Sequence, residues 1–260
     1  MLFYLTFSCF VCILFLLRDA GTNAFHGPIE DIETIEDTET RKGFYMDTGV
    51  VQSVARYAEE VLGSEGYRYA CAVVANCKML ALQIETPETE TAEEPNSAID
   101  IDALVVAAYL HDISTAEHGY ADHQIKSAEM AVEFLRDHDV PDEQVSVVEQ
   151  AILMHTTIVP EEQRKKNISE GQILYDADKL GRLSGLAVVT SLIEFGARYA
   201  NRAITGEVLA AILRHIEERF IELYQSLNTP PAREMAHDKF NQSIAFLDGV
   251  IEHLSDATPV

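Results

Sequence analysis

One segment of the chain, residues 101–113, is apolar on nearly every side of a helix. Its central run, ALVVAAYL, offers almost no polar position to solvent. A helix that is hydrophobic all round is buried, so this segment predicts a central helix that other helices must cover. The segment ends in His111-Asp112-Ile113, which places two polar side chains at the edge of the predicted core.

The remaining pattern predicts an all-α fold, a single helical bundle around that buried central helix. Apolar residues recur at helical spacing through the body of the chain, and no run shows the strict alternation of a half-buried strand. Gly63 separates the first two predicted helices, which begin near Thr48 and Tyr67. Further helices are expected over residues 127–138, 141–154, 173–183, 207–227 and 231–254. We therefore expect one domain over residues 49–255, with an acidic surface loop at 85–102.

The acidic balance of the chain restricts its partners. With 43 Asp and Glu against 19 Lys and Arg, the formal net charge is -24. This charge repels phosphate backbones, so we expect no nucleic-acid binding. A small phosphorylated substrate remains compatible with the composition if a local cation, such as a bound metal ion, meets its phosphate.

The first residues predict entry to the secretory pathway. Residues 2–17 form an uninterrupted apolar run, which is shorter than the ~20 residues of a membrane span. We expect residues 1–24 to be a signal peptide or a short membrane anchor, with a misassigned start of translation as a further alternative. The protein would then be secretory or extracellular, or else associated with a membrane through residues 2–17. Residues 25–48 are acidic and poor in periodicity, so a flexible segment is expected there.

His111, Asp112 and a later carboxylate, Asp178 in the run LYDADKL, are candidate ligands for a divalent cation. Neighbouring side chains point ~100° apart within a helix, so a His-Asp pair can face one ion only where the helix ends. Imidazole and carboxylate ligands suit Mn, Fe, Zn or Mg. The alternative for each acid is structural: Asp112 would cap the helix end, and Asp178 would pair with Lys179 or Arg182.

The motifs AAYLHDIS and YDADKL resemble those of HD-domain metal-dependent phosphohydrolases. The likeness extends over residues 50–254 and is greatest to a small branch with a DADxL motif and two long C-terminal helices, which residues 215–254 resemble throughout. The resemblance implies four metal ligands, namely an early His, the His111-Asp112 pair and a distal Asp, which falls on Asp178. In this chain Tyr69, in YACAVVANC, stands in the place of the early His, and a neutral phenol is a poor ligand.

Four histidines lie between the two motifs, and three of them are further candidates for the site, whereas the fourth, His138, has the pattern of a surface residue on an amphipathic helix. By resemblance, His118, His123 and His155 take places where the superfamily often holds extra metal-binding or phosphate-binding histidines. We assign His155, which ends an apolar helix, a catalytic role, and His118 and His123 a role in substrate binding. Lys179 and Arg182 flank the distal Asp at helical spacing, so they could meet phosphate oxygens, Lys179 in catalysis and Arg182 in substrate binding. The alternative for both cations is an ordinary ion pair with nearby acids.

These residues predict a metal-dependent phosphohydrolase that acts on a nucleotide or another small phosphate ester. A divalent cation held by His111, Asp112 and Asp178 would activate a water, and Asp112 could also accept its proton. The alternative is an inactive HD-fold protein in which Tyr69 replaces a ligand and the helical body serves as a binding or regulatory module. A third hypothesis is lyase or hydratase chemistry on a non-phosphate substrate, which the same fold hosts elsewhere.

Overall fold

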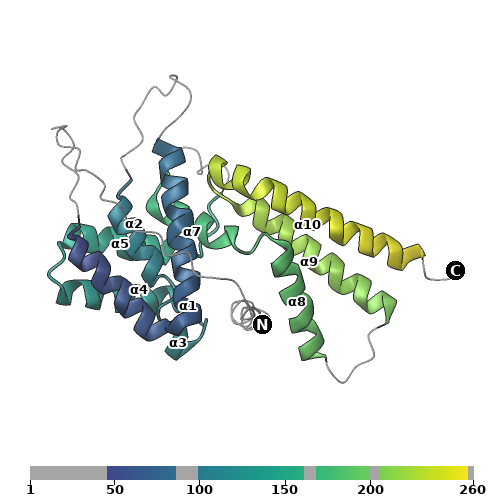
Figure 1. Cartoon of the computed structure of the whole chain (residues 1–260), viewed down its shortest axis with the longest axis horizontal. Helices are drawn as coiled ribbons and strands as arrows, with labels where there is room; N and C mark the ends of the chain where they lie inside the picture. The colour runs from purple at the N-terminus through teal and green to yellow at the C-terminus, as the bar shows by residue number, and fades with distance from the viewer. Residues whose placement is uncertain (1–45, 86–98, 161–167, 200–204, 257–260) are drawn as a thin grey trace, which may run out of the picture.

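The computed structural model describes residues 46–85, 99–160, 168–199 and 205–256. Within these ranges every regular element is helical, which confirms the all-α prediction (Figure 1). The predicted leader at 1–24, nearly all of the acidic segment at 25–48 and most of the acidic loop at 85–102 lie outside the described residues. Those three assignments stay predictions.

The first two predicted helices form one element, α1, over Thr48–Glu85, which is kinked at Gly63. Gly63 has φ 68° and ψ 178°, a conformation that residues with a side chain rarely adopt. The predicted break at Gly63 is therefore confirmed. The part of α1 that follows the break carries Tyr69.

The apolar segment forms α2, Ile101–Leu110, and seven of its ten residues are buried. Its neighbours are α1 and three later helices, α4 (His123–Asp137), α5 (Asp142–Met154) and α7 (Glu170–Leu180). The central position predicted for this helix is confirmed. Because α2 ends at Leu110, His111 and Asp112 lie just beyond its last turn, before the short helix α3, Thr115–His118.

A capping box starts α7, the helix that carries the distal motif. The Ser169 hydroxyl accepts a hydrogen bond from the backbone N–H of Gln172, and the Gln172 side chain accepts one from the backbone N–H of Ser169. This reciprocal pair satisfies two N–H groups that a helix start leaves open. It places the first residue of α7 at Glu170, three residues before the predicted start at Ile173.

Three helices follow α7: α8 (Gly185–Arg198), α9 (Gly206–Ser226) and α10 (Pro230–Asp256). Figure 1 shows α9 and α10 side by side, extending away from the cluster formed by α1 to α7. No helix is predicted over α8, whose two glycines and several β-branched residues have low helix propensity, and contacts with α9 and α10 support it. No single described helix is long and apolar enough to cross a membrane, although α7 and α8 together, bent by 69°, meet that criterion of length and composition.

Asp176 of α7 fastens the turn between α9 and α10 to the core. Its buried carboxylate accepts hydrogen bonds of 2.7 Å from the backbone N–H groups of Asn228 and Thr229 and from the Thr229 hydroxyl. Tyr175 adds a hydrogen bond of 2.8 Å from its hydroxyl to Ser226 Oγ at the end of α9. These contacts hold α9 beside the helix that carries Asp178.

Candidate metal centre and its pocket

Asp112 lies beyond the end of α2 with three imidazoles around its carboxylate. His111 Nε2 is 3.5 Å from Oδ2, while His123 Nε2 and His155 Nε2 are 3.3 and 3.6 Å from Oδ1. The three imidazoles come together because they lie at helix ends: His123 is the first residue of α4, and His155 follows the last residue of α5. One ligand atom each from Asp112, His123 and His155 all lie within 4.8 Å of one another.

A backbone carbonyl determines which nitrogen of each ring carries the proton. In each case Nδ1 lies near the carbonyl oxygen three residues earlier, at 2.8 Å for His111, 2.9 Å for His123 and 2.5 Å for His155. A carbonyl oxygen only accepts, so each Nδ1 carries hydrogen, and in the neutral ring each Nε2 presents a lone pair. All three lone pairs therefore belong to the nitrogens nearest Asp112.

Acceptor atoms that face one another repel unless a positive species lies between them. The imidazole contacts leave His111 Nε2 and Asp112 Oδ1 buried without a hydrogen-bond partner among the described residues. Unpartnered polar atoms are rare in protein interiors, and a missing ion is one of their ordinary explanations. Neutral imidazoles and a carboxylate are also suitable ligands for transition metals. The donor set around Asp112 therefore fits a divalent cation.

The titration behaviour of the site shows that Asp112 needs a positive partner. Burial would raise the pKa of Asp112, but positive charge on His111 and His155 would outweigh burial and bring the pKa well below its ordinary value. A bound cation would supply the same positive charge beside neutral imidazoles, and with either partner the carboxylate is ionised at neutral pH. Burial lowers the pKa of His155, although Asp112 opposes the shift. This favours the neutral imidazole that a metal ligand must be.

Asp178 is surrounded by donors instead of acceptors. Its Oδ1 accepts hydrogen bonds from the Tyr69 hydroxyl and, at 3.0 Å, from Arg182 Nη2, while Lys179 Nζ donates to Oδ2. The residue is only 1% exposed. Burial would raise the pKa of Asp178, but the charges of Arg182 and Lys179 outweigh burial and hold it well below its ordinary value.

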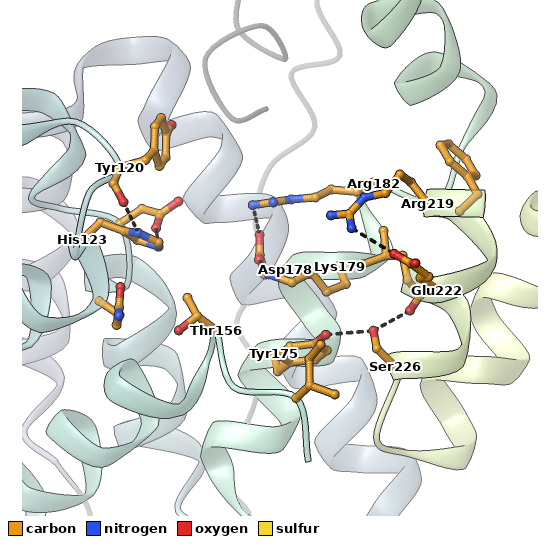
Figure 2. A pocket seen from close by; sticks show the side chains of 15 residues that line it. Tyr120, His123, Thr156, Tyr175, Asp178, Lys179, Arg182, Arg219, Glu222 and Ser226 are labelled. Carbon is orange, nitrogen blue, oxygen red and sulfur yellow. Dashed lines mark hydrogen bonds and ion pairs between the residues drawn. The ribbon is translucent and has the colours of Figure 1, made fainter. Parts of the chain in front are cut away.

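A pocket of about 480 Å³ is lined by both carboxylates. Figure 2 shows His123 on one side of it, Asp178 and Lys179 in the middle, and α9 residues on the other side. The wall formed by α9 consists of Arg219, Phe220, Glu222, Leu223 and Ser226. Cationic, anionic and apolar side chains therefore share one cavity large enough for a small organic ligand.

The structure brings most of the residues selected from the sequence together. Lining the pocket are Asp112, His123, Asp178, Lys179 and Arg182, and the rings of His111 and His155 contact Asp112. His118 is the exception. Its side chain is 48% exposed, lies 3.9 Å from Glu117, and does not line the pocket.

Several lining residues were missed by sequence reasoning. They are Tyr120, Gln124, Thr156, Ile158, Tyr175 and the five residues of the α9 wall. The α9 wall carries no motif, and its Arg219 and Glu222 resemble the ordinary charged residues of an exposed helical face. The hydrogen bonds of Tyr175 to the end of α9 and of Asp176 to the turn that follows α9 help to hold that face over the pocket.

A family model of the HD domain matches residues 70–183. This chain contains an HD domain. The matched range begins one residue after Tyr69 and includes both carboxylate clusters, whereas α8, α9 and α10 follow it. HD domains usually bind divalent metal ions, in agreement with the donor set around Asp112. Membership of the branch with the DADxL motif stays a prediction.

Solved structures share the HD fold across most of the chain. An HD-superfamily hydrolase from Bacillus thuringiensis has a TM-score of 0.59 and 17% identity, with 82% of this chain and 100% of that chain covered. A protein from Listeria innocua has a TM-score of 0.56 and 16% identity, with 80% and 96% covered. Bacillus subtilis YpgQ, solved in complex with ADP, has a TM-score of 0.52 and 14% identity, with 79% and 95% covered. At these identities the likeness concerns the fold. Comparison with curated proteins gave no match.

Proposed function

We propose that this HD-domain chain is a metal-dependent phosphohydrolase that cleaves a nucleotide or another small phosphate ester. One observation carries the proposal: a carboxylate with three imidazole Nε2 atoms within 3.6 Å of it lies in the same pocket as two basic side chains, Lys179 and Arg182. In a chain of net charge -24, such a site supplies the local positive charge that a phosphate requires.

His111, Asp112, His123 and His155 would hold the cation. A divalent ion bound there would polarise a phosphoryl oxygen and lower the pKa of a water molecule. The three imidazoles favour Mn, Fe or Zn over Mg, which prefers an all-oxygen environment. This set keeps two of the ligands expected from the sequence and adds two histidines that had been assigned to catalysis and substrate binding.

The chain's own groups would manage charge and protons around the phosphoryl group. The Asp112 carboxylate would help to hold the cation and could also accept a proton from the attacking water. Burial would lower the pKa of Arg182, but the charge of Asp178 outweighs burial and raises it, so Arg182 stays positive. Arg182 and Lys179 can therefore donate N–H groups to phosphoryl oxygens.

A nucleotide is the favoured substrate class for two reasons. YpgQ, which shares the fold, was solved with ADP bound. The pocket also extends beyond Lys179 and Arg182 to an apolar surface made by Ile158, Phe220 and Leu223, where the organic part of a phosphate ester could pack.

The test is phosphate release by the purified full chain. The protein is stripped with a chelator, reloaded with Mn²⁺, Fe²⁺, Zn²⁺ or Mg²⁺, and assayed on nucleotides and small phosphate esters. We expect activity with at least one transition metal, and its loss in Asp112→Asn. Asp137→Asn, an exposed change at the end of α4, is the matched control and should keep full activity.

Two results would contradict the proposal. A parent chain that takes up none of the four metals would favour the binding or regulatory module. A parent chain that takes up metal but releases no phosphate from any compound would turn attention to lyase or hydratase chemistry at the same pocket.

A further inference from the structure

Every oxygen of the Asp178 carboxylate already has a protein donor. Tyr69 and Arg182 donate to Oδ1 and Lys179 donates to Oδ2, with Tyr69 also 3.2 Å from the backbone carbonyl of Asp178. By contrast, the ion-pair contacts of Asp112 within the described ranges come from imidazoles alone. Asp178, the residue expected to be the distal metal ligand, is thus the one whose carboxylate oxygens already accept hydrogen bonds from protein donors.

Tyr69 acts here as a donor to Asp178. A phenol is neutral at neutral pH, because its ordinary pKa is about 10. A neutral phenol has one hydrogen, and the geometry directs it to Asp178. Tyr69 therefore stabilises the carboxylate that a histidine at this position would share with a metal.

The charges around Asp178 also disfavour a metal ion. Two basic side chains, Lys179 and Arg182, meet one carboxylate, and although burial lowers the pKa of Lys179, the charge of Asp178 opposes that shift. A dication placed at the same oxygens would be repelled by both side chains at short range. An anion would be attracted, and both cations line the pocket with N–H groups beyond those that Asp178 accepts.

We propose that Asp178 is a counter-ion that positions Lys179 and Arg182 for the phosphate of the substrate, with Tyr69 fixing it, and that it does not ligate the cation. The cation is held across the pocket by Asp112 and its histidines. This inference rests on the proposed function, since it divides one site into a cation half and an anion half.

Mn²⁺ binding to the full chain tests the cation half, with free Mn²⁺ measured by its EPR signal during titration. His123→Ala should weaken binding at least about tenfold, because it removes a ligand. Asp178→Asn should leave the Kd for Mn²⁺ within about threefold of the parent value, and so should Tyr69→Phe, which removes only the hydroxyl. Arg214→Gln, an exposed change on α9 outside the pocket, is the control. An equal loss of Mn²⁺ affinity in Asp178→Asn and His123→Ala would overturn the inference. If Asp178→Asn fails to fold, a tenfold loss in Tyr69→Phe would overturn it as well.

Binding of inorganic phosphate to the metal-free full chain tests the anion half by calorimetry. Lys179→Gln and Arg182→Gln should each weaken phosphate binding about tenfold, whereas Arg214→Gln should not. Unchanged phosphate affinity in both variants would show that the two cations serve only to neutralise Asp178 and would overturn the inference. A parent chain that binds phosphate through Lys179 and Arg182 but takes up no Mn²⁺ would uphold the anion half and contradict the proposed function alone.

Discussion

Two carboxylates line the same pocket, Asp112 beyond the end of α2 and Asp178 on α7, and their partners are of opposite kinds. Around Asp112 the ion-pair contacts in the described ranges come from imidazole Nε2 atoms at 3.3 to 3.6 Å. Around Asp178 they come from the N–H donors of Lys179 and Arg182, with the Tyr69 hydroxyl beside them. Both carboxylates are ionised, yet among the described residues only Asp178 has lysine and arginine side chains as ion-pair partners.

The difference shows that a carboxylate's role is decided by the charges and protons of its neighbours. Backbone carbonyls beside the three histidines hold hydrogen on Nδ1 and so leave acceptors toward Asp112. The cationic side chains one and four residues after Asp178 do the reverse. One half of the pocket is prepared for a cation and the other half for an anion.

The largest expected effect breaks the cation half. Asp112→Ala should lower kcat/KM for phosphate release about 10³-fold, since it removes both a ligand and a proton acceptor. That factor corresponds to about 4 kcal/mol of transition-state stabilisation. Asp178→Ala should lower kcat/KM for phosphate release only about tenfold, because the phosphate-binding cations remain but are less well positioned. Comparable losses in the two variants, measured with the same substrate and metal, would remove the distinction between the carboxylates.

A third carboxylate sharpens the comparison, because Asp176 lies on the same helix but serves the fold. Asp176→Ala leaves the N–H groups of Asn228 and Thr229 without their acceptor, which should lower the free energy of unfolding by about 3 kcal/mol. Urea denaturation followed by circular dichroism measures this free energy. Asp176→Asn keeps one acceptor oxygen and should lower the free energy of unfolding by less. If Asp176→Ala were as stable as the parent, the anchoring of α9 and α10 by this residue would be wrong.

Much of this arrangement follows from the sequence. The apolar run of α2 predicts burial, and the position of His111 and Asp112 at its end predicts a site there, because both side chains then leave the helix together. The structural alternative for Asp178, an ion pair with Lys179 or Arg182, is also present: Asp178 contacts both cations. What the motif could not show is that Tyr69 donates to the same carboxylate.

Other parts of the site depend on contacts that no local pattern reveals. The helix predicted from Ser127 begins at His123, and this earlier start brings the His123 ring to Asp112. Likewise, α8 has low intrinsic helix propensity, and the α9 wall lines the pocket with the help of Tyr175 and Asp176, which hold the end of α9 and the turn after it. Long-range packing therefore supplied the α9 residues that sequence reasoning missed.

A smaller effect is expected at the α9 wall, which extends the anion half of the pocket. Arg219 and Glu222 form an ion pair of 2.9 Å with half-exposed side chains, so the contact itself contributes little to stability. Arg219→Gln should raise KM for a nucleotide about fivefold and leave KM for p-nitrophenyl phosphate unchanged, because only the larger substrate reaches α9. Arg214→Gln again serves as the control. An equal rise for both substrates would place Arg219 at the phosphate instead.

The smallest effect is expected where the resemblance to other HD proteins would predict the largest. Tyr69→His restores an imidazole at the place of the early ligand, yet Lys179 and Arg182 would still engage Asp178. We therefore expect the Kd for Mn²⁺ to change by less than about threefold in the EPR titration. Arg68→His, which adds an imidazole at the neighbouring exposed position of α1, controls for non-specific metal binding. An increase in Mn²⁺ affinity above tenfold in Tyr69→His alone would mean that Asp178 becomes a ligand once an imidazole joins it. The hydroxyl of Tyr69, rather than the two cations, would then be what separates the two halves of the pocket.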